Sequence, residues 1–292
     1  MNLIEKDRAY VWHPFTQAQI APEPLAMTSA KGVWLYTEDG NKYMDVNSSW
    51  WTIIHGHGNQ YIADKIHEQF LQADHLVFAG ATHPKAAEVA ERIVQSLPDG
   101  FQKVFFSDNG STSVEVGIKM IYQYWYNKGA EKKRFLALEG AYHGDTFGAM
   151  SVGQRGYFNK PFEHLFFDVD FIPFPTEENI DIVLAQIEQL FETGEFAGFI
   201  FEPLVQGAAG MRIYKPEWLN KMVALAKKYG VLTIADEVMT GFYRTGTMYA
   251  IHQIEEKPDI VCMSKGVTGG VMAVGLTVTT QAMFDAFLGE ET

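Results

Sequence analysis

Hydrophobic residues change their spacing near residue 60, and this change divides the chain into two kinds of sequence. Residues 1–60 are rich in aromatics and show no long regular period. Within them, apolar runs at 33–36 and 42–46 flank the turn-forming stretch Glu38-Asp39-Gly40-Asn41, which predicts a β-hairpin. Beyond residue 60, helical periods alternate with short apolar runs.

The alternation after residue 60 predicts an α/β fold. Amphipathic helices are expected at 62–70, 85–97, 112–126, 182–191, 217–229 and from about 281; strands are expected at 104–106, 135–138, 199–201, 231–235 and 261–263. Strands that alternate with helices form βαβ units, and these build a mostly parallel sheet with helices on both faces. Such sheets bind ligands at the carboxyl ends of their strands.

Composition narrows the classes of partner. The net charge of −13 is spread without long blocks of one sign, which argues against nucleic acid or an anionic membrane as a partner. The start of the chain is charged, and no apolar run reaches the roughly 18–20 residues of a membrane-spanning helix. A cytoplasmic protein with small-molecule substrates is expected. The single cysteine, Cys262, lies in an apolar run and is expected in the core.

Two charged residues stand at the ends of apolar runs. Asp236 follows the run at 231–235, and Lys265 follows the run at 261–263. A lysine amine can condense with an aldehyde, and a carboxylate can keep a ring nitrogen protonated, which are the two groups that pyridoxal 5'-phosphate requires. Asp236 alone is also compatible with a helix cap or a metal ligand, although no clear ligand set accompanies it.

Two further stretches follow predicted strands. Gly110 and Ser111 precede a helix, whose free N–H groups and positive dipole end suit a phosphate, although an ordinary helix cap has the same pattern. Tyr142 offers a ring that can stack on a flat cofactor and His143 a group that titrates near neutral pH, although a structural turn would look similar. Together the four stretches supply a phosphate cradle, a ring stacker, a nitrogen partner and an amine.

An aromatic and histidine-rich stretch lies earlier in the chain. Trp50 and Trp51 precede the glycine-rich loop that contains His55 and His57. The histidine pair suggests a metal, but no third ligand stands out, and we expect none. Paired tryptophans are typical of a core, but beside such a loop they can also line a substrate pocket.

Longer motifs in the chain match a known family. These are Asp236-Glu237-Val238-Met239-Thr240-Gly241-Phe242-Tyr243-Arg244-Thr245-Gly246, Pro258-Asp259-Ile260-Val261 and Ser264-Lys265-Gly266. They closely resemble the class III aminotransferases, which are fold-type I pyridoxal-phosphate enzymes. Further motifs are Trp12-His13-Pro14-Phe15-Thr16, Ser48-Ser49-Trp50-Trp51, Ile54-His55-Gly56 and Tyr142-His143-Gly144-Asp145-Thr146-Phe147-Gly148-Ala149-Met150. They resemble the members that convert 8-amino-7-oxononanoate to 7,8-diaminononanoate in biotin biosynthesis, by ping-pong kinetics.

The resemblance implies roles for individual residues. Lys265 would carry the Schiff base and Asp236 would pair with the pyridine nitrogen. Gly110 and Ser111 would hold the phosphate, and Tyr142 would stack near the ring. Substrate contacts are implied for Trp50, Tyr142, Phe15, Asp145 and Arg244.

The resemblance also implies an organisation of the whole enzyme. Residues 1–60 would belong to a small domain, and residues 61–292 would form the large cofactor-binding domain. Family members continue with a loop that reaches the neighbouring subunit's phosphate and with a C-terminal domain that carries an arginine. The sequence therefore looks like a fragment that lacks this domain, and the full-length enzyme is expected to be a homodimer.

Two residues depart from the family patterns. Phe15 stands where members that use adenosylmethionine often carry tyrosine, which leaves adenosylmethionine and lysine open as amino donors. Ala208 stands where ornithine- and 4-aminobutyrate-type relatives place a glutamate, which counts against those substrates.

Two alternative functions stay open. The protein can be another class III enzyme that acts on an ω-amino acid or a diamine, or a non-catalytic fragment that binds the cofactor poorly. A nicotinamide-dependent dehydrogenase is disfavoured because the glycine fingerprint of those enzymes is missing.

Overall fold

The structure is a computed structural model that describes residues 1–289. The chain divides into two compact units, Met1–His75 and Leu76–Thr292. The assignment of residues 1–60 to a small domain, and of the remainder to a large one, stays a prediction.

The N-terminal unit is built around a small antiparallel sheet. Its elements are α1 (Leu3–Tyr10), β1 (Met27–Lys31), β2 (Trp34–Thr37), β3 (Lys42–Met44), α2 (Ser48–Trp51) and α3 (Gln60–Gln72). The predicted hairpin is confirmed by the pairing of Leu35 with Tyr43. Helix α1 and strand β1 lie where the sequence indicated irregular structure. Neither element shows a periodic pattern of apolar residues in the sequence, because α1 buries no residue and β1 is almost entirely exposed.

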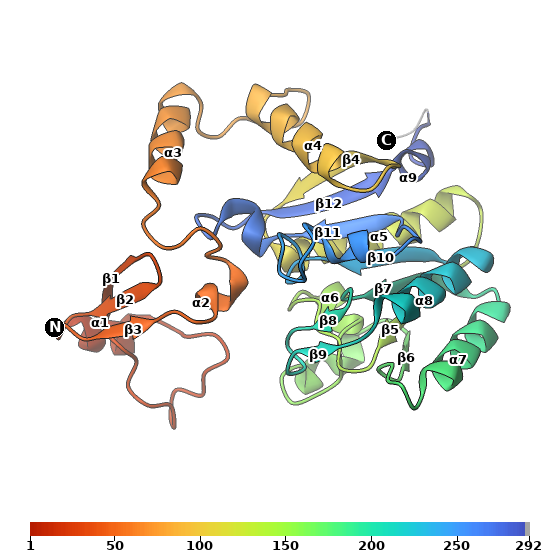
Figure 1. Ribbon diagram of the computed structural model, residues 1–292, viewed down its shortest axis with the longest axis horizontal. Coiled ribbons are helices and arrows are strands. Elements are labelled where there is room, and N and C mark those ends of the chain that lie inside the picture. Colours follow the sequence, from red (N-terminus) through yellow and green to blue (C-terminus); the bar gives the residue numbers. More distant parts are fainter. Residues whose placement is uncertain (290–292) are drawn as a thin grey trace. The chain divides into compact units, whose positions relative to one another are not determined.

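The second unit contains a seven-stranded sheet (Figure 1). Its strands are β4 (Phe101–Ser107), β5 (Arg134–Leu138), β6 (Val169–Ile172), β7 (Phe196–Phe201), β10 (Leu232–Asp236), β11 (Ile260–Met263) and β12 (Gly275–Thr280). Their order is β4-β12-β11-β10-β7-β5-β6. Strand β12 is antiparallel to both neighbours and the other strands run in one direction, which confirms the mostly parallel sheet.

Strands β6 and β12 were not expected from the sequence. Strand β6 lies at the edge of the sheet and contains Asp170, whose carboxylate pairs with Arg134 at 2.8 Å. Strand β12 is rich in threonine rather than in large apolar residues. Hydrophobicity alone therefore misses both strands, because an edge position or a buried hydroxyl with a partner tolerates polar side chains.

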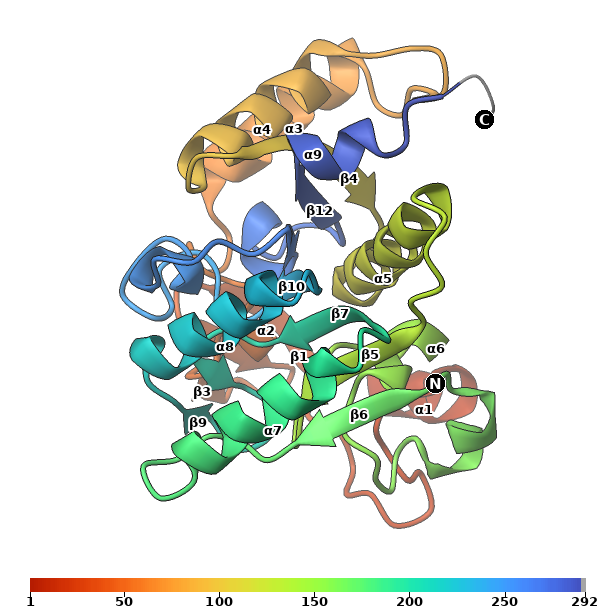
Figure 2. The same cartoon turned by 90° about the vertical axis from the view of Figure 1, so that its right-hand side faces the viewer.

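Helices cover both faces of the sheet. They are α4 (Pro84–Ser96), α5 (Gly110–Asn127), α6 (Phe147–Ser151), α7 (Ile180–Glu192), α8 (Pro216–Lys228) and α9 (Gln281–Asp285). Short elements are η1 (Lys160–Leu165), β8 (Val205–Gln206), β9 (Arg212–Ile213), η2 (Ala250–Gln253) and η3 (Lys265–Thr268). Figure 2 shows α7 and α8 on one side of the strands and α5 on the other.

The core is split into two layers by the sheet. On β5, Leu136 and Leu138 pack in the cluster that includes α7 and α8, whereas Phe135 and Ala137 pack in the cluster that includes α5. Alternate residues of a strand point to opposite faces, so both faces of β5 are buried. Cys262 is fully buried in the α5 cluster, as expected.

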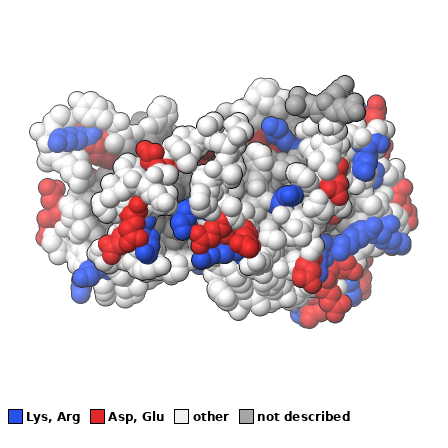
Figure 3. All heavy atoms as spheres, turned by 90° about the horizontal axis from the view of Figure 1, so that it is seen from above, with Lys and Arg blue, Asp and Glu red and all other residues white. Residues whose placement is uncertain are grey.

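The surface carries charges of both signs. On the face shown in Figure 3, acidic and basic side chains are interspersed. Among the helices that the structure describes, none has both the length and the apolar character needed to cross a bilayer.

Candidate active site

Four connections at the carboxyl ends of parallel strands carry the residues singled out in the sequence. Gly110 follows β4, Tyr142 follows β5, Asp236 ends β10 and Lys265 follows β11. Because these strands run in the same direction, their carboxyl ends meet at one edge of the sheet. The fold therefore gathers the four predicted groups of this unit at the edge where α/β proteins bind ligands.

Asp236 is a buried carboxylate with two hydrogen-bond donors. The Val238 N–H donates to its Oδ1 at 3.0 Å, and His143 Nδ1 lies 2.7 Å from its Oδ2. Asp236 is 4% exposed, and the His143 side chain is fully buried. Hydrogen bonds of this kind fix the direction of the carboxylate. It can therefore serve as the partner of a ring nitrogen.

His143 has a second ring nitrogen without a partner. Its Nε2 is buried and has no hydrogen-bond partner among the described residues. Buried polar atoms normally have a partner. An unpaired atom on the residue that contacts Asp236 fits a site that receives a polar ligand.

Glu202 is a further buried carboxylate at the same edge of the sheet. It follows strand β7, all of whose residues are buried, and accepts the N–H groups of Tyr142 at 3.1 Å and Gly207 at 3.0 Å. Burial raises the pKa of Glu202 to about 7, and the charge of Asp236 acts in the same direction while His143 opposes it. Glu202 is not among the site residues predicted from the sequence, although an acid directly after a wholly apolar strand is the same signal that identified Asp236.

Lys265 begins the turn η3 with its backbone in the left-handed region, at a φ of 46°. Burial lowers its pKa; Arg244 acts in the same direction, whereas Asp236 and Glu202 act against it. A lysine with a lowered pKa is more often neutral and can act as a nucleophile or a base. The turn is tight, because a Cβ on Gly266 would lie 2.9 Å from the Phe242 ring.

The start of α5 carries Gly110 and Ser111, the residues predicted to bind an anion. Asn109 caps the helix by accepting the Thr112 N–H at 3.0 Å, and the first amides of a helix have no carbonyl within the helix to bond. A Cβ on Gly110 would meet Val238 at 2.8 Å, so only glycine allows the helix to begin this close to the loop after β10. The Ser111 hydroxyl accepts the Asp145 N–H at 3.1 Å.

Tyr142, Asp145 and Arg244 flank these groups. The Tyr142 hydroxyl donates to Asp145 at 2.8 Å, and Tyr142 is 40% exposed. Arg244 Nε donates to the Met239 carbonyl at 3.0 Å, and burial lowers its pKa. The structure therefore joins Tyr142 to Asp145 directly and ties Arg244 to the loop that follows β10.

Phe15 and Trp50 lie in the N-terminal unit and contact each other. Their ring centroids are 5.9 Å apart, and the rings meet edge to face at 62°. Trp50 belongs to α2, whose four residues, Ser48–Trp51, all have positive φ. A left-handed conformation costs about 1–2 kcal/mol for each residue other than glycine, so this segment stores strain.

The structure places His57, a member of the histidine pair, beside a carboxylate. His57 Nε2 lies 2.9 Å from the Asp45 carboxylate. Among residues 1–289, no group of three or more His, Cys, Asp or Glu side chains is arranged to hold a metal ion.

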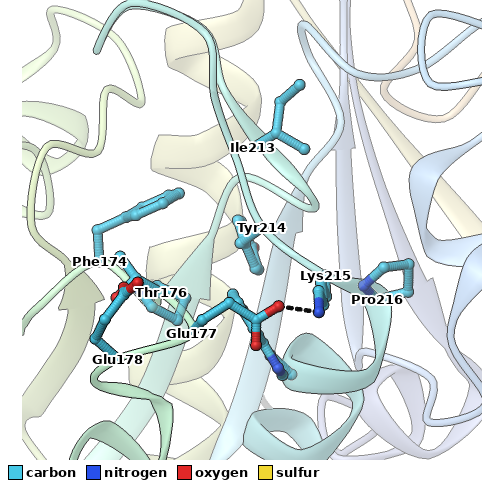
Figure 4. Close-up of a pocket in the computed structure, with 10 residues that line it drawn as sticks. Phe174, Thr176, Glu177, Glu178, Ile213, Tyr214, Lys215 and Pro216 are labelled. Carbon is cyan, nitrogen blue, oxygen red and sulfur yellow. Dashed lines mark hydrogen bonds and ion pairs between the residues drawn. The ribbon is translucent and has the colours of Figure 1, made fainter.

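A cavity of about 460 Å³ lies outside this constellation. It is lined by Phe174, Pro175, Thr176, Glu177, Glu178, Ile213, Tyr214, Lys215, Pro216 and Trp218. Figure 4 shows Glu177 and Lys215 paired across it. None of the predicted site residues lines it, and it brings no nucleophile or base together with Lys265.

Comparison with known proteins identifies the family. The family model for class III aminotransferases matches residues 16–291. The chain belongs to the class III aminotransferases. This confirms the resemblance found in the sequence, and class III aminotransferases depend on pyridoxal phosphate.

Individual class III aminotransferases are similar over nearly the whole chain. The adenosylmethionine-8-amino-7-oxononanoate aminotransferases of Synechococcus elongatus and Staphylococcus aureus are 46% and 40% identical to it, over 95% and 99% of this chain and 68% of each relative. The crystal structure of the Methanocaldococcus jannaschii enzyme of the same name superposes with a TM-score of 0.93 at 35% identity, over 99% of this chain and 67% of that one. The crystal structure of an (S)-enantioselective ω-transaminase from Thermomicrobium roseum superposes with a TM-score of 0.92 at 29% identity, over 99% of this chain and 68% of that one. The chain thus spans about two thirds of the length of these relatives.

The site residues fit pyridoxal phosphate. Four features fit this cofactor's ring, phosphate and aldehyde. They are the unpaired His143 nitrogen, the buried Asp236 carboxylate that His143 contacts, the close approach at Gly110 and the lysine with a lowered pKa.

Proposed function

We propose that this protein transfers an amino group to 8-amino-7-oxononanoate and forms 7,8-diaminononanoate, with adenosylmethionine or lysine as the donor. The observation that carries this proposal is the 46% identity to a relative that bears this activity in its name. The two donors stay open because Phe15 replaces the tyrosine that is frequent in users of adenosylmethionine.

In this proposal each residue of the chain has a defined task. Pyridoxal phosphate, once bound, would supply an electron sink for the substrate's α-carbon. Lys265 Nζ would move the proton from the donor's α-carbon to the C4' carbon of the cofactor, and in the second half-reaction from C4' to the acceptor's carbon. Asp236 keeps the ring nitrogen protonated, and His143 fixes the direction of the Asp236 carboxylate.

The remaining groups bind and orient. The first amides of α5, at Gly110 and Ser111, hold the phosphate through the positive end of the helix. Tyr142 packs against the ring, with its hydroxyl held by Asp145. Trp50, Phe15 and Arg244 contact substrate. The proposal also includes a cytoplasmic homodimer as the working form, and sedimentation of the purified protein tests the dimer.

Peptide mapping tests the lysine. The purified protein is incubated with pyridoxal phosphate, reduced with borohydride and digested. The proposal expects the label on Lys265 and its loss in Lys265→Ala. A label on Lys119 or Lys160 instead would contradict the assignment. Absence of the cofactor's absorbance would favour the alternative of a fragment that binds it poorly.

Substrate screening tests the reaction. Product formation is followed by mass spectrometry with 8-amino-7-oxononanoate and each donor, for the wild type and for Phe15→Tyr. We expect 7,8-diaminononanoate in both proteins and a shift toward adenosylmethionine in Phe15→Tyr, which regains a hydroxyl. Faster turnover of ω-amino acids or diamines would favour the second candidate, which the similarity to named ω-transaminases supports.

A further inference from the structure

The segment that carries Trp50 is a left-handed helical turn. Its residues Ser48–Trp51 have φ values of 53°, 47°, 59° and 67°. Its backbone hydrogen bonds join each N–H to the carbonyl four residues earlier, as in a helix. The N–H of Trp51 donates to the Asn47 carbonyl at 2.8 Å, and the N–H of Thr52 donates to the Ser48 carbonyl at 2.9 Å. L-residues avoid this conformation because Cβ approaches the following carbonyl oxygen. Such a turn persists only where its surroundings hold it.

One carboxylate holds the turn in its middle. Asp45 Oδ1 accepts the Ser49 N–H at 2.9 Å, and Asp45 Oδ2 accepts the Ser49 hydroxyl at 2.8 Å and His57 Nε2–H at 2.9 Å. The side chains of Asp45 and His57 are only 6% and 15% exposed. Burial by itself raises the pKa of Asp45, but the hydrogen bonds from Ser49 and His57 outweigh it and lower the pKa. The carboxylate therefore stays ionised and its bonds are strong.

Both members of the Asp45–His57 pair are anchored on the hairpin. The Asp45 N–H donates to the Val33 carbonyl at 2.9 Å. The backbones of His57 and Gly32 exchange two hydrogen bonds, of 2.8 and 2.9 Å. A Cβ on Gly56 would lie 3.3 Å from the Gly32 Cα, so the loop before His57 also packs closely on the hairpin. The turn is thus fastened to a fixed base on both sides.

We propose that Asp45 and His57 are positioning residues that clamp the left-handed turn and thereby fix the ring of Trp50 for the amino-acceptor substrate. The clamp gives the His-x-His stretch, which resembles a pair of metal ligands, a structural role, because His57 is hydrogen-bonded to Asp45. Trp50 as a residue is 58% exposed and its ring rests edge to face on Phe15, so the direction of the ring depends on the backbone that carries it. The substrate contact of Trp50 rests on the proposed function, whereas the clamp rests on the geometry alone.

The test uses the cofactor-loaded protein labelled with 5-fluorotryptophan. The chain has six tryptophans, and the ¹⁹F signal of Trp50 is the one that Trp50→Phe removes. We expect Asp45→Asn to shift or broaden the Trp50 signal and to leave that of Trp218, in the other unit, unchanged. In the same samples, KM for the acceptor should rise about tenfold while kcat stays within about threefold, because a binding residue is displaced and the lysine is not.

Three variants distinguish a clamp from general damage. His57→Gln retains an N–H donor and should keep the wild-type Trp50 signal, whereas His57→Ala should not. Adding Ser48→Gly to Asp45→Asn removes strain at one position and should restore most of the signal. Asp39→Asn makes the same chemical change at a carboxylate that bonds Thr37 and Asn41, away from the turn, and should change neither readout.

The outcomes separate the clamp from the proposed function. An unchanged Trp50 signal in both Asp45→Asn and His57→Ala would overturn the clamp, whatever the kinetics. A changed signal with no rescue by Ser48→Gly and with lost cofactor would also overturn it, because the damage would then be general. A changed signal with rescue supports the clamp. If Trp50→Phe then leaves KM for every acceptor unchanged, the substrate contact assigned to Trp50 fails and the clamp stands.

Discussion

The two units hold their candidate residues by different forces. In Leu76–Thr292 the site residues stand at the ends of strands whose two faces are covered by buried apolar clusters. In Met1–His75, all of which the structure describes, Thr37 is the only buried residue, and it is still 8% exposed; Trp50 lies on a strained turn that the Asp45 carboxylate holds. The sheet unit positions side chains by packing, and the N-terminal unit positions them by polar bonds.

This difference bears on how each region tolerates change. A large apolar core can support buried charges, because the fold is stabilised elsewhere by many contacts. Accordingly, Asp236, Glu202 and Glu237 are all buried within the sheet unit. A turn that depends on a few hydrogen bonds has no comparable set of stabilising contacts. We therefore expect site substitutions in the sheet unit to abolish chemistry, and substitutions around the turn in the N-terminal unit to change the orientation of Trp50.

The largest effect is expected from Asp236→Asn. A neutral amide cannot keep the ring nitrogen protonated, so turnover should fall by orders of magnitude, while substrate binding changes less. Single-turnover kinetics measure this, with Asp39→Asn as the matched control in the other unit. Turnover within about tenfold of the wild type would mean that Asp236 serves only the structure.

Core substitutions test the difference in packing. Phe199→Ala removes a fully buried ring from β7 and should lower the free energy of unfolding by about 3–5 kcal/mol. Leu35→Ala, at a half-buried position of β2, should cost about 1 kcal/mol. Equilibrium unfolding in guanidinium chloride, followed by two spectroscopic probes, measures the loss of stability in each variant. Equal costs would remove the distinction between the two units.

Glu202 gives the sheet unit a pH-dependent stability. Because its pKa is about 7 in the folded protein and about 4.3 when unfolded, the folded state binds the proton more tightly. Stability from this group is present at low pH and is lost as pH rises toward 7, by roughly 3 kcal/mol at most.

Glu202→Gln should therefore flatten the pH dependence of unfolding between about pH 4.5 and 7. It should do so only in part, because burial also raises the pKa of Glu237 to about 7. Unfolding of the cofactor-free protein across this range, compared with Glu237→Gln, provides the measurement. An unchanged slope in Glu202→Gln would show that Glu202 is ionised throughout.

The smallest effect is expected in the left-handed turn. Glycine adopts positive φ without strain, so Ser48→Gly alone should be neutral or stabilise the protein by up to about 1 kcal/mol. Ser29→Gly, at an exposed position inside β1, should instead destabilise it slightly, because glycine weakens strands. Thermal unfolding of the two variants gives the comparison. A clear loss in Ser48→Gly would mean that the turn is not strained at that position.

Several parts of the fold and of the site followed from the sequence. Asp236 and Lys265 end or follow runs of apolar residues. A charged residue in that place predicts a functional group at the end of a strand. The same signal was present at Glu202 and was not used. Strands β6 and β12 were missed because they carry Asp170 and threonines, whose partners, such as Arg134, come from elsewhere in the chain.

What the sequence determined by itself was most of the strands and helices of the sheet unit, the family and the identity of the strand-end groups, because each depends on the spacing and type of neighbouring residues. Tertiary structure alone decided that His143 contacts Asp236 across 93 positions and that Asp45 fastens Ser49 and His57. It also decided that Ser48–Trp51 turn to the left. No local pattern predicts a left-handed turn of four residues, because its local energy is unfavourable and only contacts with the hairpin offset that cost.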